Sequence, residues 1–331
     1  MQRLEMVNQW LAGLFPGRPY SIEPASADAS FRRYFRVTLD DGTSRIVMDA
    51  PPEHEDCRPF VRIAGLLKDA GVHAPDVLAQ DLARGLLLLS DLGSTLYIDA
   101  LDESNADALF GDALDALVKW QMASRPDALP PYDEALLRRE LGLFPDWYVA
   151  RHLGTPLDER QRETLEHMEV LLLRNILAQP CVFVHRDYMP RNLMVCENNP
   201  GVLDFQDAVY GPISYDVVSL FRDAFLSWEE ERVIDWSVRY WEKARRAGLP
   251  VDSDFGDFYR NLEWMGVQRH LKVLGIFARL NYRDGKPKYL ADTPRFLGYV
   301  RHVATRYAPL APLARLLDEL ESRSPTVGYT F

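Results

Sequence analysis

Residues 181–207 of this 331-residue chain are CVFVHRDYMPRNLMVCENNPGVLDFQD, and this stretch decides how the other segments are interpreted. Apolar and β-branched residues at 181–184 lead into a polar loop, and two short apolar runs then flank the turn cluster 197–201. Asn, Pro and Gly in such a cluster favour a tight turn, so the two runs predict a β-hairpin. Antiparallel pairing would place Asn192, just before the first strand, and Asp204, just after the second, at the same end of the hairpin.

The polar loop before this hairpin carries Asp187, five residues before Asn192. Two carboxylates and an amide oxygen at one end of a hairpin suit a hard cation such as Mg²⁺. Each residue alone has an ordinary explanation as a turn or cap residue. Together, His185, Asp187, Asn192 and Asp204 resemble the H-x-D-x-x-x-x-N and D-F-G motifs of protein-kinase-like phosphotransferases. The combination therefore predicts phosphoryl transfer.

Composition limits the class of protein. The hydrophobic share of 47% and the charged share of 26% are typical of a globular protein, and the length suits one large bilobed domain or two small ones. The net charge of −11 argues against binding to nucleic acid or to anionic membranes. We take a monomer as the working expectation for the oligomeric state.

Three features of the sequence bear on the cellular location. They are the cysteines, the lack of a long apolar segment and the N-terminal pattern. Cys57, Cys181 and Cys196 form neither a C-x-x-C pair nor a disulfide framework, which fits a reducing compartment. No stretch approaches the ~20 apolar residues of a membrane span. Apolar residues of 1–17 recur at helical spacing among polar ones, so we expect a packed helix and no signal peptide. These features predict a cytoplasmic protein.

The first part of the chain is predicted to be a small sheet with one helix. Residues 20–50 favour strands, and the small-residue turn 26–30 either lies over a nucleotide or is a plain hairpin turn. A helix is expected at 55–70, followed by strands at 77–80 and 86–89. The second of these strands ends at Ser90-Asp91-Leu92, a natural crossing between two lobes.

From about residue 96 the chain is predicted to be mainly helical apart from the central hairpin. The helix candidates are 105–122, 164–177, 228–247 and 261–280. A further helix opens in the run 211–220, where Asp216 either favours the helix dipole or holds the catalytic loop, a structural role in both cases.

The hairpin and its flanks resemble the aminoglycoside phosphotransferase/choline kinase family, and the likeness covers most of the chain. Its segments ASADASFRRYFRV, IVMDAPPE, LLLLSDLG, VFVHRDYMPRNLM, VLDFQDAVYGPISYDVVSL and WMGVQRHLKVLGIFARLNYRDGK look most similar to the anomeric N-acetylmuramate/N-acetylglucosamine kinases of peptidoglycan recycling.

This resemblance implies an α+β, bilobed fold, with a small β-rich nucleotide-binding lobe at 1–92 and a larger, mainly helical catalytic lobe at 93–331. It also implies roles for single residues. Asp187 would be the catalytic base, and Asn192 and Asp204 would hold Mg²⁺. Ser90, Asp91 and Leu92 would lie along the adenine ring of ATP.

One position departs from the kinase-like pattern. Such enzymes place a lysine on the third strand to hold the ATP phosphates, whereas this chain has Asp49 there, after Ile46-Val47-Met48. Lys68 is the only lysine before Lys119, and it falls late in the predicted 55–70 helix. We therefore expect an arginine to take the role of the phosphate cation. The candidates are Arg32, Arg33, Arg36 and Arg45.

The acceptor is predicted from charge. Between residues 260 and 301 nine Lys/Arg stand against three acids, a local balance of +6 in an acidic protein. N-acetylmuramate carries a lactyl carboxylate, so this basic segment suits it better than a cationic aminoglycoside. Arg269 is the expected carboxylate contact, because a guanidinium matches a carboxylate bidentately. The alternative for Arg269 is a surface residue whose stem packs on the helix.

Two rival functions stay open. One is phosphorylation of an aminoglycoside or of another small-molecule hydroxyl. The other is a pseudokinase that binds nucleotide without turnover, a class supported only by the missing lysine.

Overall fold

The computed structural model describes residues 2–27 and 31–323, which form two compact units. The first unit consists of 1–123 together with 191–207, and the second consists of 124–190 together with 208–331. The chain therefore passes between the units at 190–191 and again at 207–208. The lobe boundary was predicted at residue 92, whereas the first unit continues to residue 123. The predicted division into lobes of different function stays a prediction.

The first unit is built on a five-stranded antiparallel sheet with the strand order β1-β2-β3-β5-β4. Strand β5 is buried at four successive residues, as expected for an interior strand, whereas the edge strand β4 alternates between partly buried and exposed residues. The bounds are β1 Tyr20–Ala27, β2 Arg33–Leu39, β3 Ser44–Asp49, β4 Val77–Asp81 and β5 Leu86–Ser90. The predicted strands at 77–80 and 86–89 are confirmed as β4 and β5.

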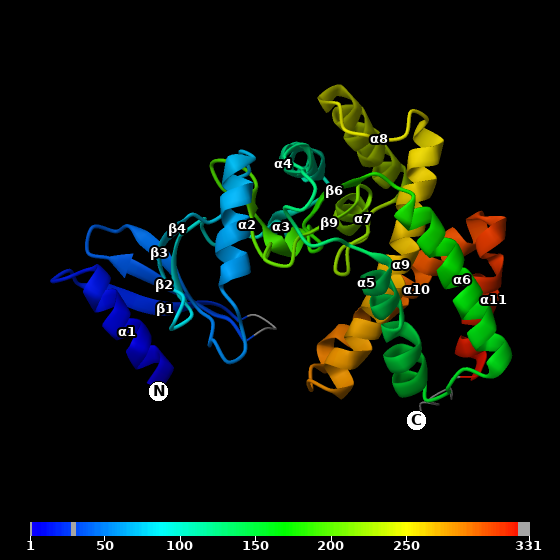
Figure 1. Ribbon diagram of the computed structural model, residues 1–331, viewed down its shortest axis with the longest axis horizontal. Helices are drawn as coiled ribbons and strands as arrows, with labels where there is room; N and C mark the ends of the chain where they lie inside the picture. The colour runs from blue at the N-terminus through cyan, green and yellow to red at the C-terminus, as the bar shows by residue number, and fades with distance from the viewer. Residues whose placement is uncertain (1, 28–30, 324–331) are drawn as a thin grey trace. The chain divides into compact units, whose positions relative to one another are not determined.

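Helix α1 (Gln2–Leu14) lies along this sheet in Figure 1. Its Val7 and Leu11 pack in a buried cluster with residues of β2, β3 and β5, among them Val37 and Val47. Burial of such side chains contributes roughly 1.5–3 kcal/mol each, so this cluster fastens the N-terminal helix to the sheet. The predicted N-terminal packed helix is confirmed over the described residues.

The rest of the first unit is helical apart from the central hairpin. Its helices are α2 Arg58–Asp69, α3 Tyr97–Ala100 and α4 Ala106–Met122, and its hairpin strands are β7 Leu193–Met194 and β8 Gly201–Val202. The hairpin at the centre of the sequence analysis is confirmed, since Leu193 pairs with Val202 and Met194 with Gly201. The turn predicted at 26–30 lies partly outside the described residues, which omit 28–30.

The second unit is mainly helical. Its elements are α5 Glu134–Leu141, the π-helix η1 Phe144–His152, α6 Glu159–Leu177, β6 Cys181–Val184, β9 Val209–Pro212, α7 Tyr215–Phe221, α8 Glu230–Ala247, α9 Phe255–Tyr282, η3 Pro287–Asp292, α10 Thr293–Arg306, η4 Ala308–Leu310 and α11 Ala311–Arg323. Strand β6 pairs antiparallel with β9, which the sequence analysis did not predict. The short turn η2 (Pro190–Asn192) carries the chain from β6 toward β7.

Helix α9 is the central element of the second unit, and it packs against η1, α10, α6, α7, α5 and α8. It begins where Asp254 accepts a hydrogen bond from the backbone N–H of Asp257 at 3.0 Å. Its contact with η1 is very close, because a β-carbon on Gly275 would lie 2.3 Å from the carbonyl carbon of Leu143. Only glycine fits at this point.

No helix in the described residues is long and apolar enough to cross a membrane.

Candidate active site

The loop that follows β6 is held by Asp216, the second residue of α7. Its carboxylate accepts hydrogen bonds from the backbone N–H groups of His185, at 2.6 Å, and Arg186, at 3.0 Å. Asp216 is fully buried. Burial raises the pKa of Asp216 to about 7, against the lowering effect of the two backbone N–H groups. The structural role expected for Asp216 as the residue that shapes the catalytic loop is confirmed.

Arg186 has a strained backbone, with φ at +76°, in the left-handed region that non-glycine residues rarely adopt. Such strain persists only where surrounding contacts impose it. The next residue, Asp187, donates its backbone N–H toward Nδ1 of His185 at 3.3 Å. The loop around Asp187 is thus held through its backbone.

The second unit also holds a buried cluster centred on Glu140, near the end of α5. One carboxylate oxygen of Glu140 lies 2.6 Å from Nη2 of Arg186 and 2.8 Å from Nζ of Lys272. The other oxygen accepts from the Tyr132 hydroxyl and from Nε2 of Gln268 at 3.4 Å. Burial alone would raise the pKa of Glu140, but the charges of Lys272 and Arg186 lower it. Glu140 is therefore ionised at neutral pH.

The predicted metal ligands Asn192 and Asp204 flank the β7–β8 hairpin in the first unit. The backbone N–H of Leu203 donates to the carbonyl oxygen of Asn192 at 2.9 Å, so the two ends of the hairpin are adjacent. Asp204 adopts φ of +60°, and Nε2 of Gln206 donates to its Oδ1 at 2.9 Å. An amide and a carboxylate at one hairpin end are oxygen donors that fit Mg²⁺. Asp187 belongs to the second unit, four residues before the chain enters the first at Arg191.

Two hydrogen bonds and one ring contact hold the hairpin and its flanks within the first unit. The backbone N–H of Val202 donates to the carbonyl of His73 at 2.7 Å, and that of Val195 donates to the carbonyl of Thr95 at 2.9 Å. The phenyl rings of Phe60, on α2, and Phe205 lie 4.6 Å apart between centroids. The residue after Asp204 is thereby anchored in the core.

The crossing after β5 is held by contacts with neighbouring segments of the first unit. Ser90 Oγ accepts from the backbone N–H of Asp76 at 2.8 Å, and the side chain of Leu92 packs at Gly201. Asp91 accepts from Arg36 at 2.6 and 3.1 Å. Although burial alone would raise it, the pKa of Asp91 is lowered by Arg36. Arg36, a phosphate candidate, is therefore committed to the crossing.

The position of the missing lysine is filled by a buried ion cluster. Asp49 is fully buried and pairs with Arg33, on β2, and with Arg3, on α1. Arg45 donates to the carbonyl of Ser44 at 2.6 Å. These contacts commit Arg33 to the sheet.

Arg32 differs from its neighbour Arg33. Its Nη2 lies 3.7 Å from Oδ1 of Asp204, and its Nε lies 4.0 Å from Glu55. Arg32 is thus the predicted phosphate cation that the described residues place beside a predicted metal ligand, Asp204. The phosphate roles of Arg32, Arg33 and Arg45 stay predictions.

Arg269 is buried, with 3% of its surface exposed, so the alternative of a surface arginine is wrong. Its charge acts on Asp216, where it opposes the rise in the pKa that burial causes. Arg269 is therefore close enough to Asp216 for their charges to interact. Its predicted contact with the acceptor stays a prediction.

The sequence analysis missed Glu140 and Lys272. Lys272 lies in the basic segment 260–301, which gave a general signal, whereas nothing local distinguishes Glu140 from any acid near the end of a helix.

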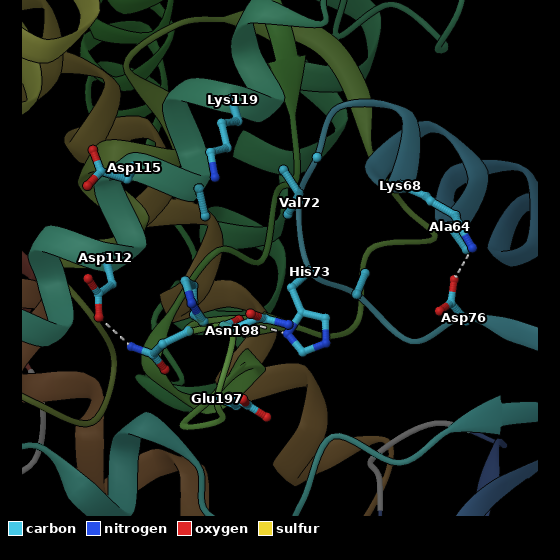
Figure 2. Close-up of a pocket in the computed structure, with 15 residues that line it drawn as sticks. Ala64, Lys68, Val72, His73, Asp76, Asp112, Asp115, Lys119, Glu197 and Asn198 are labelled. Carbon is cyan, nitrogen blue, oxygen red and sulfur yellow. Dashed lines mark hydrogen bonds and ion pairs between the residues drawn. The ribbon is translucent and has the colours of Figure 1, made fainter.

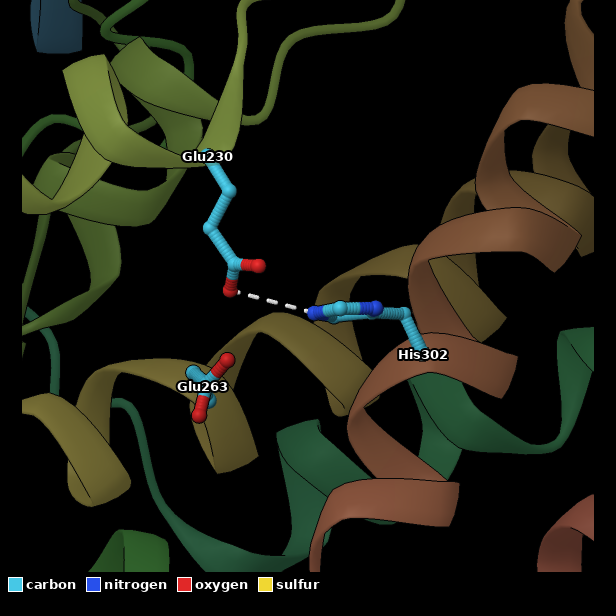
Figure 3. Close-up of side chains that lie close together, drawn as sticks. All are labelled: Glu230, Glu263 and His302. Carbon is cyan, nitrogen blue, oxygen red and sulfur yellow. Dashed lines mark hydrogen bonds and ion pairs between the residues drawn. The ribbon is translucent and has the colours of Figure 1, made fainter.

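Two other groups of charged side chains lie apart from these residues, one in each unit. Figure 2 shows a cavity of about 690 Å³ in the first unit, between α4, the loop after α2 and the hairpin turn. None of the predicted site residues lines this cavity. Its charged lining consists of four acids and two lysines: Asp76, Asp112, Asp115, Glu197, Lys68 and Lys119. In the second unit, Figure 3 shows Glu230, Glu263 and His302 close together. Arg306 pairs with both glutamates, so these residues form an ion-pair network.

Comparison with known proteins agrees with this geometry. Residues 21–251 match the model of the phosphotransferase enzyme family. The chain belongs to that family. It is 55% identical to the N-acetylmuramate/N-acetylglucosamine kinase of Pseudomonas aeruginosa, over 96% of this chain and 97% of that protein. It is 51% identical to the kinase of the same name from Neisseria meningitidis, over the full length of both.

Solved structures of the family share the fold. An aminoglycoside phosphotransferase with ADP bound superposes with a TM-score of 0.56 at 14% identity, over 89% of this chain and 97% of that one. The predicted α+β, protein-kinase-like fold and the predicted membership of the phosphotransferase family are confirmed. The chain is a phosphotransferase, and its family implies the use of ATP.

Proposed function

We propose that this enzyme uses ATP and Mg²⁺ to phosphorylate the anomeric (C1) hydroxyl of N-acetylmuramate and N-acetylglucosamine. The observation that carries the proposal is the loop of Asp187, fixed by two backbone hydrogen bonds to Asp216. The two relatives above, at 51 and 55% identity over almost the whole chain, support the choice of amino sugars.

Asp187 acts as the base. Its carboxylate orients the C1 hydroxyl and takes the proton late, as the oxygen forms its bond to the terminal phosphorus and the bond to the β-phosphate oxygen breaks. A carboxylate is adequate for this step because the proton becomes acidic only in the transition state. A magnesium ion held by Asn192 and Asp204 would neutralise charge on the phosphates.

Residues 1–92 form the nucleotide lobe in this proposal, and residues 93–331 the catalytic lobe. The crossing at Ser90, Asp91 and Leu92 contacts the adenine through backbone groups. Arg32 is the best-supported phosphate cation, because it lies beside Asp204. The protein works as a cytoplasmic monomer in peptidoglycan recycling.

The rival readings have weaker support. The likeness to aminoglycoside phosphotransferases rests on 14% identity and concerns the fold alone. A pseudokinase would explain Asp49 at the lysine position, but it would not explain the ordered Asp187 loop or the arginine at Asp204.

The test is a panel of acceptors with ATP and Mg²⁺, with products located by phosphorus NMR. The panel holds N-acetylmuramate, N-acetylglucosamine, an aminoglycoside and choline. We expect phosphate on C1 of the two amino sugars only. The matched control is Asp187→Asn, which should keep the fold and ATP binding but lower turnover by about 10²–10⁴-fold. Phosphorylation of the aminoglycoside alone would refute the proposal, and near-normal turnover by Asp187→Asn would remove Asp187 from its role.

A further inference from the structure

The face of α9 that carries Lys272 continues beyond this residue toward the end of the helix. Because an α-helix has about 3.6 residues per turn, Ile276, Arg279 and Arg283 follow Lys272 along one face. Lys272 is buried, Ile276 and Arg279 are partly exposed, and Arg283 is exposed. The face therefore starts in the buried cluster around Glu140 and opens to the surface two to three turns later.

This face starts next to the proposed base. Lys272 lies 2.8 Å from a carboxylate oxygen of Glu140 that also pairs with Arg186, the residue before Asp187. Burial alone would lower the pKa of Lys272, but nearby groups raise it, and the carboxylate of Asp187 is among them. Lys272 and Asp187 are thus close enough for their charges to interact. An acceptor whose hydroxyl meets Asp187 would bring its other substituents near the face that leads away from Lys272.

Arg279 is the cation of this face that lacks an ion pair. Arg283 pairs with Asp284 at 2.7 and 2.9 Å, whereas Arg279 forms no ion pair with an acid of the described residues. Its Nε is buried without a hydrogen-bond partner among those residues. Burial lowers the pKa of Arg279, the charge of Arg283 lowers it further, and Asp284 offsets these effects only in part. A guanidinium in this state gains free energy when an anion binds it.

The end of the Arg279 side chain is open to such an anion. Its Nε is the one nitrogen of this guanidinium that is both buried and without a partner in the described part of the chain. The two Nη atoms have no partner there either, so they reach solvent. They present their N–H groups side by side, the arrangement that a carboxylate matches with two parallel hydrogen bonds.

Helix geometry brings this guanidinium back toward Lys272. Arg279 comes seven residues after Lys272, which is about 10 Å along the helix axis. Helical side chains lean toward the N-terminus and cover the preceding turn, so a long side chain recovers about 5 Å of this separation. The remaining separation is comparable with the width of one sugar ring.

We infer that Arg279 binds the lactyl carboxylate of N-acetylmuramate while the C1 hydroxyl of the sugar meets Asp187. The inference rests on the proposed function and deepens it, because it names the residue that distinguishes the acidic sugar from a neutral one. N-acetylglucosamine has no carboxylate and leaves Arg279 in contact with solvent. The neutral sugar is then still a substrate, but it binds with one charge-assisted contact fewer.

Two other cations of α9 fit this role less well. Lys272 is already bound to Glu140 at 2.8 Å and to the Tyr215 hydroxyl at 3.1 Å. Arg269 is only 3% exposed, and its charge acts on Asp216, which is fully buried. In this proposal the carboxylate contact predicted for Arg269 belongs to Arg279, which lies ten residues further along the same helix.

The experiment measures kcat and KM for three acceptors: N-acetylmuramate, its methyl ester and N-acetylglucosamine. Wild type should use the acid roughly ten- to a hundredfold better than the ester. Arg279→Gln should lose most of this preference through a higher KM for the acid alone, because the carboxylate does not change during phosphoryl transfer. Arg279→Lys should retain part of it, since it keeps the charge but loses the paired N–H groups. The matched control is Arg283→Gln, which should keep the preference because Arg283 is bonded to Asp284.

The arms of this experiment separate the possible failures. Equal use of the acid and the ester by wild type overturns the inference, whatever the variants do, so this result does not depend on the folding of Arg279→Gln. A preference that Arg279→Gln retains overturns it, as does a loss that is equal for all three acceptors. Loss of the preference in Arg283→Gln to the same extent also overturns it, because the general charge of the face would then be responsible. Absence of C1 phosphorylation with every acceptor overturns the proposed function itself.

Discussion

The buried carboxylates Asp49 and Glu140, one in each unit, both hold two cations, yet the cations differ in how far they are removed from water. The side chain of Arg33 on Asp49 is 47% exposed, whereas that of Lys272 on Glu140 is 11% exposed. A cation that keeps contact with solvent costs little if its partner is lost. A buried cation depends on its partner.

The two clusters therefore differ mainly in one cation each. The cluster at Asp49 joins α1 and β2 to β3, and its Arg33 keeps contact with solvent, whereas its Arg3, at 23% exposed, resembles Arg186 of the Glu140 cluster, at 21%. Lys272 is the most buried of the four cations and depends most on its carboxylate.

Removal of each central carboxylate gives the largest contrast. Glu140→Ala should lower the free energy of unfolding by about 3–5 kcal/mol, because Lys272 stays buried without its anion. Asp49→Ala should cost only about 1–2 kcal/mol, because Arg33 can return to water. Denaturant unfolding of both variants at neutral pH measures the two values. Equal losses would break the comparison between the clusters.

A second test compares two neighbouring arginines, Arg32 and Arg33, of which only Arg33 belongs to the Asp49 cluster. Arg32→Gln should raise the KM for ATP by roughly ten- to a hundredfold, because Arg32 lies beside Asp204 and is the proposed phosphate cation, whose bonds to phosphate would be charge-assisted. Arg33→Gln is the matched control, and it should change this KM much less, because Arg33 serves Asp49. A larger effect at Arg33 would assign the phosphate cation to the Asp49 cluster.

Glu169, on α6, supplies the smallest test, because it is a partly buried carboxylate without two close cations. Burial raises the pKa of Glu169 to about 7, and Arg138 offsets this only in part. Its folded pKa lies above the unfolded value, so the stability it contributes is present below about pH 4.5 and is lost as the pH rises through about 7.

Glu169→Gln cannot ionise and should escape this loss. The variant should match wild type near pH 4.5 and be about 1 kcal/mol more stable at pH 8, an amount limited by solvent screening of a partly exposed group. Unfolding at both pH values measures this, with Glu163→Gln, an exposed glutamate on the same helix, as the control. A stability difference that does not vary with pH would show that burial does not control the charge of Glu169.

Much of the fold could be predicted because its signals are local. The turn cluster 197–201 predicted the hairpin, and the helix expected at 261–280 lies within α9. Strand β9 was missed because Gly211 and Pro212 are poor strand residues, and its pairing with β6 depends on residues about 30 positions away. The π-helix η1 has no periodic signal that sequence reasoning would recognise.

The candidate site at Asp187, Asn192 and Asp204 was inferred from spacing, and the roles of these residues stay predictions. It was not predictable where chemistry depends on contacts between distant segments. Glu140 meets Arg186 and Lys272 across 46 and 132 residues of chain, and neither contact leaves a local pattern. The absent lysine was visible in the sequence, but the pairing of Arg33 with Asp49 and the approach of Arg32 to Asp204 were not.

The close approach of α9 to η1 at Gly275 limits how far the side chains of the Glu140 cluster can shift. Gly275 lies three residues, less than one turn, after Lys272, and the backbone at Leu143 leaves no room for a β-carbon. Any side chain at 275 would push the helix away and carry the Lys272 ammonium with it. The place of the Lys272 ammonium beside Glu140 therefore depends on a residue that has no side chain.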